Sequence, residues 1–187
     1  LHINEIISVR PETCQVDVRA QAVLFASGIY ARLPEDMPDK LALAVLDVAG
    51  APAQTAKIVK PGNTVLVIGA GGKSGLLCLH EAKKRAGITG KVIALDLTTN
   101  ALARIRQAGS ADAIIQADAQ EPVAVLKKVV EASAGALADV TINCVDIPGT
   151  EMTSILATKD GGMVYFFSMA TSFTASALGA EGVGKDV

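Results

Sequence analysis

From Thr64 to Phe167 the chain alternates short apolar runs with longer segments of helical periodicity. Each apolar run has the length of a strand, and its unbroken apolar character indicates burial on both faces. Strands that alternate with helices are typical of a parallel sheet covered by helices, and right-handed crossovers make a doubly wound α/β sheet the expected fold. The expected strands are 65–68, 91–96, 113–115, 140–145 and 163–167, and the expected helices are 41–59 (broken at 50–52), 74–85, 98–107, 122–132 and 151–158.

The first 38 residues follow a different pattern. Val16 and Val18 alternate with charged residues, and this period of two predicts short antiparallel strands. The segment 34–38 contains two prolines and predicts a turn or linker. We therefore expect two parts, a β-rich remnant of a separate domain over 1–38 and the doubly wound domain over 39–187.

The C-terminal tail over 179–185 is rich in glycine and is expected to be a loop. A doubly wound domain commonly has a sixth strand, and no segment after 167 supplies one. The chain also begins with Leu1 instead of methionine. Both features predict a piece of a longer protein.

The composition excludes several classes of protein. Hydrophobic residues make up 50% and charged residues 19%, which argues against disorder. Aromatic residues make up only 3% and the net charge is −2, so neither stacking on nucleic-acid bases nor a basic field for phosphates is expected. No apolar run approaches the roughly 20 residues of a membrane span, and no signal peptide is visible. Cys14, Cys78 and Cys144 are too few and too scattered for a disulfide framework or a zinc cluster.

The sharpest motif is GAGGKSG over Gly69–Gly75, between an expected strand and an expected helix. This context is typical of a phosphate-binding turn, because a helix N-terminus presents free N–H groups and a partial positive charge. A tight turn that binds nothing is the alternative. The residues expected to contact a dinucleotide here are Gly69, Gly71, Gly72, Lys73, Ser74 and Gly75.

Individual positions in this loop have separate expected roles. Gly69 would allow the tight turn, and Gly71 and Gly72 would let a pyrophosphate approach the backbone. The spacing departs from G-x-G-x-x-G, because the third position is Ser74 and glycine arrives one residue later. Ser74 is small enough to permit close packing of the helix on the strand. Lys73 either faces solvent or contacts phosphate.

Asp96 ends the second strand of this unit, 21 residues beyond Gly75. That spacing fits the acid that hydrogen-bonds a ribose hydroxyl of the dinucleotide. A carboxylate there repels a 2′-phosphate, so NAD is favoured over NADP. An ordinary cap of the helix that follows is the alternative for Asp96.

Other candidate residues follow the carboxyl ends of the remaining strands, where ligands of this fold lie. Asp118 would flank the adenine, the loop 146–150 follows the fourth strand at the same edge, and the loop 168–172 after the fifth strand would lie near the nicotinamide. Plain connecting loops are the alternative at each place. The further residues expected at the cofactor are Asp118, Cys144, Ser168 and Met169.

Asp47 interrupts an apolar run in the first helix of the larger part. A buried carboxylate requires a partner or a chemical role. Asp47 is therefore expected to be buried and either paired structurally or functional.

The segment Lys57–Gly72, which leads into the glycine motif, resembles the start of the cofactor domain of medium-chain dehydrogenases. Residues 28–38, 46–54 and 161–187 more specifically resemble the L-erythro-3,5-diaminohexanoate dehydrogenases of lysine fermentation. The resemblance covers essentially the whole chain. It implies an NAD-binding Rossmann domain over 39–187 and a missing catalytic domain before Leu1.

The resemblance implies a cytoplasmic, homo-oligomeric enzyme that acts on a small diamino acid with NAD and has no nucleic-acid or membrane partner. The candidate acids for its chemistry are Asp47, Asp146 and Glu151. No metal is expected, because no Cys or His occurs between Cys14 and Cys78, where related enzymes have a zinc ligand. An alcohol or quinone oxidoreductase, a non-catalytic dinucleotide-binding module and a methyltransferase are the alternatives.

Overall fold

The computed structural model describes all 187 residues, which divide into two compact units, Leu1–Ala42 and Leu43–Val187. The division falls inside helix α1 (Asp39–Leu46), slightly beyond the boundary expected after residue 38. Each unit is described by itself below.

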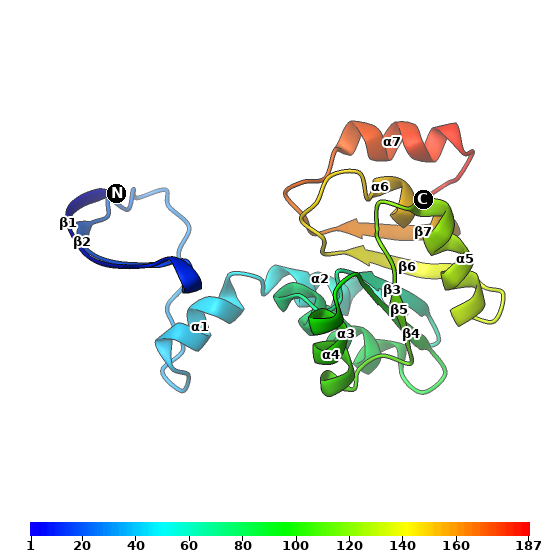
Figure 1. Ribbon diagram of the computed structural model, residues 1–187, viewed down its shortest axis with the longest axis horizontal. Helices are drawn as coiled ribbons and strands as arrows, with labels where there is room; N and C mark the ends of the chain where they lie inside the picture. The colour runs from blue at the N-terminus through cyan, green and yellow to red at the C-terminus, as the bar shows by residue number, and fades with distance from the viewer. The chain divides into compact units, whose positions relative to one another are not determined.

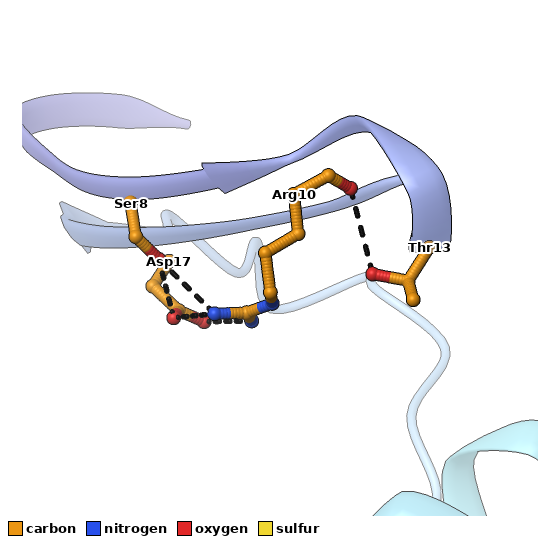
Figure 2. A network of polar contacts seen from close by, with 4 residues as sticks. All are labelled: Ser8, Arg10, Thr13 and Asp17. Atoms are coloured by element: carbon orange, nitrogen blue, oxygen red, sulfur yellow. Dashed lines mark hydrogen bonds and ion pairs between the residues drawn. The ribbon is translucent and has the colours of Figure 1, made fainter.

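The smaller unit contains an antiparallel hairpin of β1 (His2–Arg10) and β2 (Gln15–Gln21), joined by the 3₁₀ turn η1 (Pro11–Thr13). Cys14 follows the turn with φ 54°, in the left-handed region that lets the chain reverse direction. Figure 2 shows the polar network that joins the two strands at this end. The antiparallel strands expected from the period-two pattern are present.

The carboxylate of Asp17 is the centre of this network. Arg10 donates from Nη1 to Oδ2 at 2.6 Å and from Nη2 to Oδ1 at 2.8 Å, and Ser8 Oγ donates to Oδ2 at 2.8 Å (Figure 2). These hydrogen bonds favour the charged form and lower the pKa of Asp17 to about 2. A lowered folded-state pKa stabilises the hairpin above the ordinary carboxyl pKa, and the contribution is lost as the pH falls toward 2.

We expect a carboxyl NMR titration to give Asp17 a pKa of about 2. Arg10→Ala should raise the pKa toward the ordinary range of an aspartate, because the bidentate donor is gone and only the Ser8 hydrogen bond remains. Arg19→Ala is the matched control, because Arg19 pairs with Glu5 instead. An ordinary Asp17 pKa in the unaltered protein would contradict the network.

The helical segment expected over 41–59 is two helices, α1 and α2 (Gly50–Ile58). The break lies at 47–49 and not at 50–52 as expected. Pro52 lies in the first turn of α2, where a residue without an N–H costs no intrahelical hydrogen bond. Proline therefore marks the start of the second helix, not the break.

The larger unit is built on a five-stranded sheet in the order β5-β4-β3-β6-β7, with every neighbouring pair parallel (Figure 1). The chain runs outward from β3 to β5, then crosses back and builds β6 and β7 on the other side of β3. The predicted doubly wound sheet is thus confirmed, and its order reverses between β3 and β6. The strands are β3 (Thr64–Ile68), β4 (Lys91–Asp96), β5 (Ala113–Gln116), β6 (Ala138–Asn143) and β7 (Thr158–Phe166).

Helices cover both faces of this sheet. Val65 and Val67 point toward α2, α3 (Lys73–Ala86) and α4 (Thr99–Ala108), whereas Leu66 and Ile68 point toward the side of α5 (Pro122–Ala132) and α6 (Glu151–Ala157). All four strand side chains are fully buried, which explains the unbroken apolar runs of the sequence. None of the helices combines the length and apolar character needed to cross a membrane.

The expectation of a loop in the C-terminal tail is wrong for most of it, because α7 spans Phe173–Gly182. Ser172 caps this helix, its Oγ accepting from the Ala175 N–H at 3.2 Å. Gly179 lets α7 approach α6 closely, since a Cβ there would lie 3.2 Å from Ile155 Cδ1. Lys185 then donates to carbonyl oxygens at the end of α6, which ties the tail back.

Candidate cofactor-binding site

Two cavities open at the carboxyl ends of the parallel strands, the edge where ligands of this fold bind. The β4–β5 cavity, of about 170 Å³, is lined by Gly69, Asp96, Asp118 and their neighbours. The β6–β7 cavity, of about 520 Å³, is lined by Asp47, Val48, Ser74, Cys144, Asp146, Phe166, Phe167, Ser168 and Met169. The phosphate loop Gly69–Gly75 contributes a residue to each cavity, so it lies at the place where an extended dinucleotide would pass from one to the other.

Gly69 makes the tight turn expected after β3. Its φ is +74°, a left-handed conformation that favours glycine. A Cβ at this position would lie 2.7 Å from Val145 Cγ2 and 3.1 Å from the backbone of Cys144. Both backbone freedom and close packing therefore require glycine here.

The close helix–strand contact belongs to Gly75, not to Ser74 as expected. A Cβ on Gly75 would lie 2.7 Å from Ala70 Cα and would also clash with the Gly69 carbonyl oxygen. Gly75 is buried, whereas Ser74 is half-buried and lines the β6–β7 cavity. The loop thus has one residue more than the common pattern, and the last glycine still performs the packing role.

Gly71 and Gly72 have different environments. A Cβ on Gly71 would lie 2.6 Å from Ala101 Cβ, so Gly71 faces α4 and not an open side. Gly72 is exposed, and a Cβ there would meet only the Gly69 carbonyl oxygen at 3.4 Å. Of these two glycines, Gly72 is the one that leaves room for a ligand to approach.

The N-terminus of α3 is free to bind an anion. Gly72 is its N-cap, and neither a capping side chain nor an acidic residue occupies the first turn. The first N–H groups of a helix have no intrahelical acceptor, and they carry the positive end of the helix dipole. The loop therefore fits a pyrophosphate both sterically and electrostatically.

Asp96 lies beside this loop at the end of β4. Its Oδ2 accepts from the Gly71 N–H at 2.9 Å, and its Oδ1 accepts from the Leu97 N–H at 2.8 Å. Thr98, not Asp96, caps α4 by accepting from Ala101 N–H. Asp96 lines the β4–β5 cavity, the region where the ribose of a dinucleotide would lie.

Asp118 lines the same cavity from the segment after β5. It is exposed, and its Oδ1 accepts from the Gln120 N–H at 2.9 Å. Asp96 and Asp118, the two acids expected at the adenosine half of a dinucleotide, therefore line the same cavity.

Asp47 lines the β6–β7 cavity but is not buried as expected. Its side chain is 69% exposed and forms an ion pair with Lys73, Nζ to Oδ2, at 2.8 Å. The turn between α1 and α2 places it outside the core, which explains the polar residue in the apolar run. An exposed ion pair of this kind contributes about 0–1 kcal/mol to stability. The position of Asp47 beside a cavity is therefore more informative about its role than the stability that its ion pair contributes.

The other two candidate acids hold the loop after β7. Asp146 Oδ1 accepts from the Ala170 N–H at 3.0 Å and from Ser168 Oγ at 3.4 Å. Glu151 is buried and accepts from the Ser172 N–H at 2.7 Å. Asp146 lines the β6–β7 cavity together with Asp47, whereas Glu151 does not.

Cys144 lines the β6–β7 cavity, and its Sγ lies 4.0 Å from Sγ of Cys78 on α3. All three cysteines are free thiols. The contact with Cys78 and burial raise the pKa of the Cys144 thiol, which keeps it protonated. Cys144 therefore presents a neutral, apolar surface to the cavity. No group of three or more His, Cys, Asp and Glu side chains gathers closely enough to hold a metal ion.

The sequence interpretation missed Asn143, which organises the loop after β6. It is fully buried, donating from Nδ2 to Thr150 Oγ1 at 2.9 Å and to Ser154 Oγ at 3.0 Å. Its Oδ1 accepts from the Val145 N–H at 3.0 Å. A lone amide at the end of an apolar strand was the available signal, because a buried amide requires partners. The interpretation also missed Leu97, Thr98, Gln120 and Val145, which line the β4–β5 cavity. Ile147 and Thr150, from the loop expected at this edge after the fourth strand, line the same cavity.

Comparison with known proteins gives close relatives in sequence. The chain is 57% identical over all 187 residues to L-erythro-3,5-diaminohexanoate dehydrogenase of Acetoanaerobium sticklandii and 54% identical to that of Fusobacterium nucleatum. It spans 54% of the length of each, about half of these relatives. No protein-family model matches the chain.

Solved structures give the same fold. A zinc-dependent alcohol dehydrogenase from Streptococcus pneumoniae aligns with a TM-score of 0.60 and 25% identity, over 79% of this chain and 42% of that one. Mycobacterial Rv1454c, solved with NADPH, aligns with a TM-score of 0.63 and 22% identity, over 76% of this chain and 42% of that one. The sequence relatives are named as dehydrogenases, and the second of these structures holds NADPH. The resemblance seen in the sequence is thus confirmed: the chain has the fold of the medium-chain dehydrogenases, and in sequence it is similar over its whole length to L-erythro-3,5-diaminohexanoate dehydrogenases.

Proposed function

We propose that this chain forms the cofactor-binding part of an NAD-dependent enzyme that oxidatively deaminates L-erythro-3,5-diaminohexanoate to 5-amino-3-oxohexanoate in lysine fermentation. The observation that carries this proposal is the identity of 57% over the whole chain to a protein of that name. The phosphate loop supports the cofactor half of the proposal, because its glycine packing and uncapped helix N-terminus fit a pyrophosphate.

NAD is favoured over NADP by the charge beside the loop. Asp96 supplies two carboxylate oxygens in the β4–β5 cavity, where they would accept hydrogen bonds from ribose hydroxyls. The same charge repels a 2′-phosphate. Bound NAD would supply the acceptor for the hydride that leaves the amine-bearing carbon.

The β6–β7 cavity suits a substrate with ammonium groups. Asp47 and Asp146 both line it, and carboxylates attract and orient ammonium ions by charge-assisted hydrogen bonds. An ammonium group must lose a proton before hydride can leave its carbon, so a general base is required. Asp47 is our candidate for that base, because it lines the cavity and its carboxylate accepts from the side chain of Lys73 and from no backbone N–H. Asp146 holds the loop after β7 and is a positioning group.

The test is to supply the full-length protein with 3,5-diaminohexanoate and NAD and to follow NADH absorbance. Turnover with the diamino acid supports the proposal. Turnover only with alcohols or quinones would support the alternative that the fold similarity to alcohol dehydrogenases favours. Binding of NAD without turnover of any substrate would indicate a non-catalytic dinucleotide-binding module.

Asp47→Asn is expected to lower kcat by about a hundredfold, because a general base contributes about 10²–10⁴-fold. The stability of the fold should stay nearly unchanged, since the Asp47–Lys73 ion pair is exposed. Steady-state kinetics and a thermal melt measure both effects. Glu151→Gln is the control, and it should lower stability more than kcat because Glu151 is buried and holds the loop at Ser172. A kcat within twofold of the unaltered enzyme would exclude Asp47 as the base.

The assembled enzyme is proposed to be a cytoplasmic homo-oligomer whose only partner is its small diamino acid substrate, without nucleic-acid or membrane partners. The modest net charge of −2 supports the absence of nucleic acid. Light scattering of the full-length protein would measure its oligomeric state.

A further inference from the structure

Arg104 on α4 contacts the phosphate loop from outside both cavities. Its Nε donates to the carbonyl oxygen of Gly71 at 2.8 Å. The residue is otherwise exposed, and its guanidinium forms no ion pair with any carboxylate. Arg104 therefore connects α4 to a loop that lies 33 residues earlier in the sequence, and its positive charge has no carboxylate partner.

With this hydrogen bond, three residues hold Gly71, namely Asp96, Ala101 and Arg104, and we call these contacts the Gly71 clamp. The Gly71 N–H is held by Asp96 Oδ2 at 2.9 Å, and its Cα packs against Ala101, so closely that a Cβ would lie 2.6 Å from Ala101 Cβ. Arg104 holds the remaining polar group, the carbonyl oxygen. Gly71 is thus fixed on three sides by the end of β4 and by α4.

The direction of the Gly71 carbonyl matters for an anion. In a trans peptide the C=O and the next N–H point in opposite directions. With the Gly71 carbonyl turned to α4, the Gly72 N–H points to the Gly69 carbonyl oxygen, at 3.2 Å, and closes the turn that precedes α3. A carbonyl oxygen turned the other way would add negative partial charge where the phosphates of a dinucleotide are expected.

We propose that Arg104 is a positioning residue for the dinucleotide: by holding the Gly71 carbonyl against α4, it keeps the phosphate loop in its anion-binding conformation. The inference rests on the proposed function, since it assumes that the loop binds the pyrophosphate of NAD. Arg104 acts through Gly71, not through contact with the reacting atoms.

The experiment compares the full-length protein with Arg104→Ala, Arg104→Lys and Arg106→Ala. Arg106 is the matched control, because it lies on the same helix and is also exposed. Arg104→Ala should raise the Kd for NAD about tenfold, the loss expected for one hydrogen bond from a charged group. KM for NAD should rise in parallel while kcat stays unchanged, Arg104→Lys should recover part of the affinity, and Arg106→Ala should stay within twofold.

Amide hydrogen exchange of the segment 69–75 in the protein without cofactor supplies an independent readout. Exchange should be faster in Arg104→Ala than in Arg106→Ala, because the clamp is lost. Equal exchange rates would overturn the inference: with a raised Kd they would indicate direct contact with the cofactor, and with an unchanged Kd they would indicate no role. If the unaltered protein does not bind NAD at all, the proposed function fails, and the exchange rates still decide whether Arg104 holds the loop.

Discussion

Gly75→Ala is expected to lower the free energy of unfolding by about 2–3 kcal/mol and to abolish NAD binding. A Cβ there would lie 2.7 Å from Ala70 Cα and would clash with the Gly69 carbonyl oxygen. These neighbours are backbone atoms, which cannot rotate away as a flexible side chain can. Relief requires α3 to move away from β3, and that movement displaces the phosphate loop. Chemical denaturation and NAD titration of the variant measure the two effects.

Gly72→Ala is the matched control in the same loop. Its Cβ would meet only the Gly69 carbonyl oxygen, at 3.4 Å, and the φ of −77° suits alanine. We expect stability within about 0.5 kcal/mol of the unaltered protein, with weaker NAD binding because the methyl group occupies the open side of the loop. Equal losses of stability in the two variants would show that Gly75 has no special packing role.

Asp96→Asn is expected to shift the cofactor preference from NAD toward NADP. Loss of the carboxylate should weaken NAD binding about tenfold and remove the repulsion of a 2′-phosphate, so that the ratio of NAD to NADP affinity falls about a hundredfold. Asparagine retains one acceptor oxygen, so it preserves part of the hydrogen bonding to the Gly71 and Leu97 N–H groups. Titration of both cofactors gives the ratio, and a thermal melt reports any loss of fold.

Asp118→Asn provides the comparison for this prediction. Asp118 lines the same cavity, but its carboxylate is exposed and accepts only from the Gln120 N–H. Removing its charge should change both affinities similarly and leave their ratio nearly constant. If Asp96→Asn also leaves the ratio constant, Asp96 does not select the cofactor.

Most of the larger unit could be predicted from local pattern. The apolar runs at Val65–Ile68 and Val92–Leu95 predict strands buried on both faces, and these strands pair in register at the centre of the sheet. The motif Gly69–Gly75 lies between β3 and α3 as expected, because its position depends on the chain order of strand, turn and helix. The alternation of apolar and charged residues predicts the strands of the hairpin in the smaller unit.

The departures arise where the environment comes from distant residues. The apolar sequence neighbours of Asp47 predict a buried side chain, yet a turn between two helices leaves it exposed and paired with Lys73. The glycines of the tail over 179–185 predict a loop, yet α7 extends to Gly182, and Gly179 lets it pack closely on α6. The local sequence reveals neither Lys73, which pairs with Asp47, nor α6, against which α7 packs.

By itself the sequence determined the alternation of strands and helices, the doubly wound sheet and the place of the glycine loop before a helix, because these depend on residues adjacent in the chain. Only the tertiary structure decided how that loop is held. Gly71 is fixed by Asp96, Ala101 and Arg104, and Gly75 is pressed against Gly69 and Ala70. Such contacts join residues from different strands and helices, and their direction depends on the packing of α4 beside the loop, which no local pattern encodes.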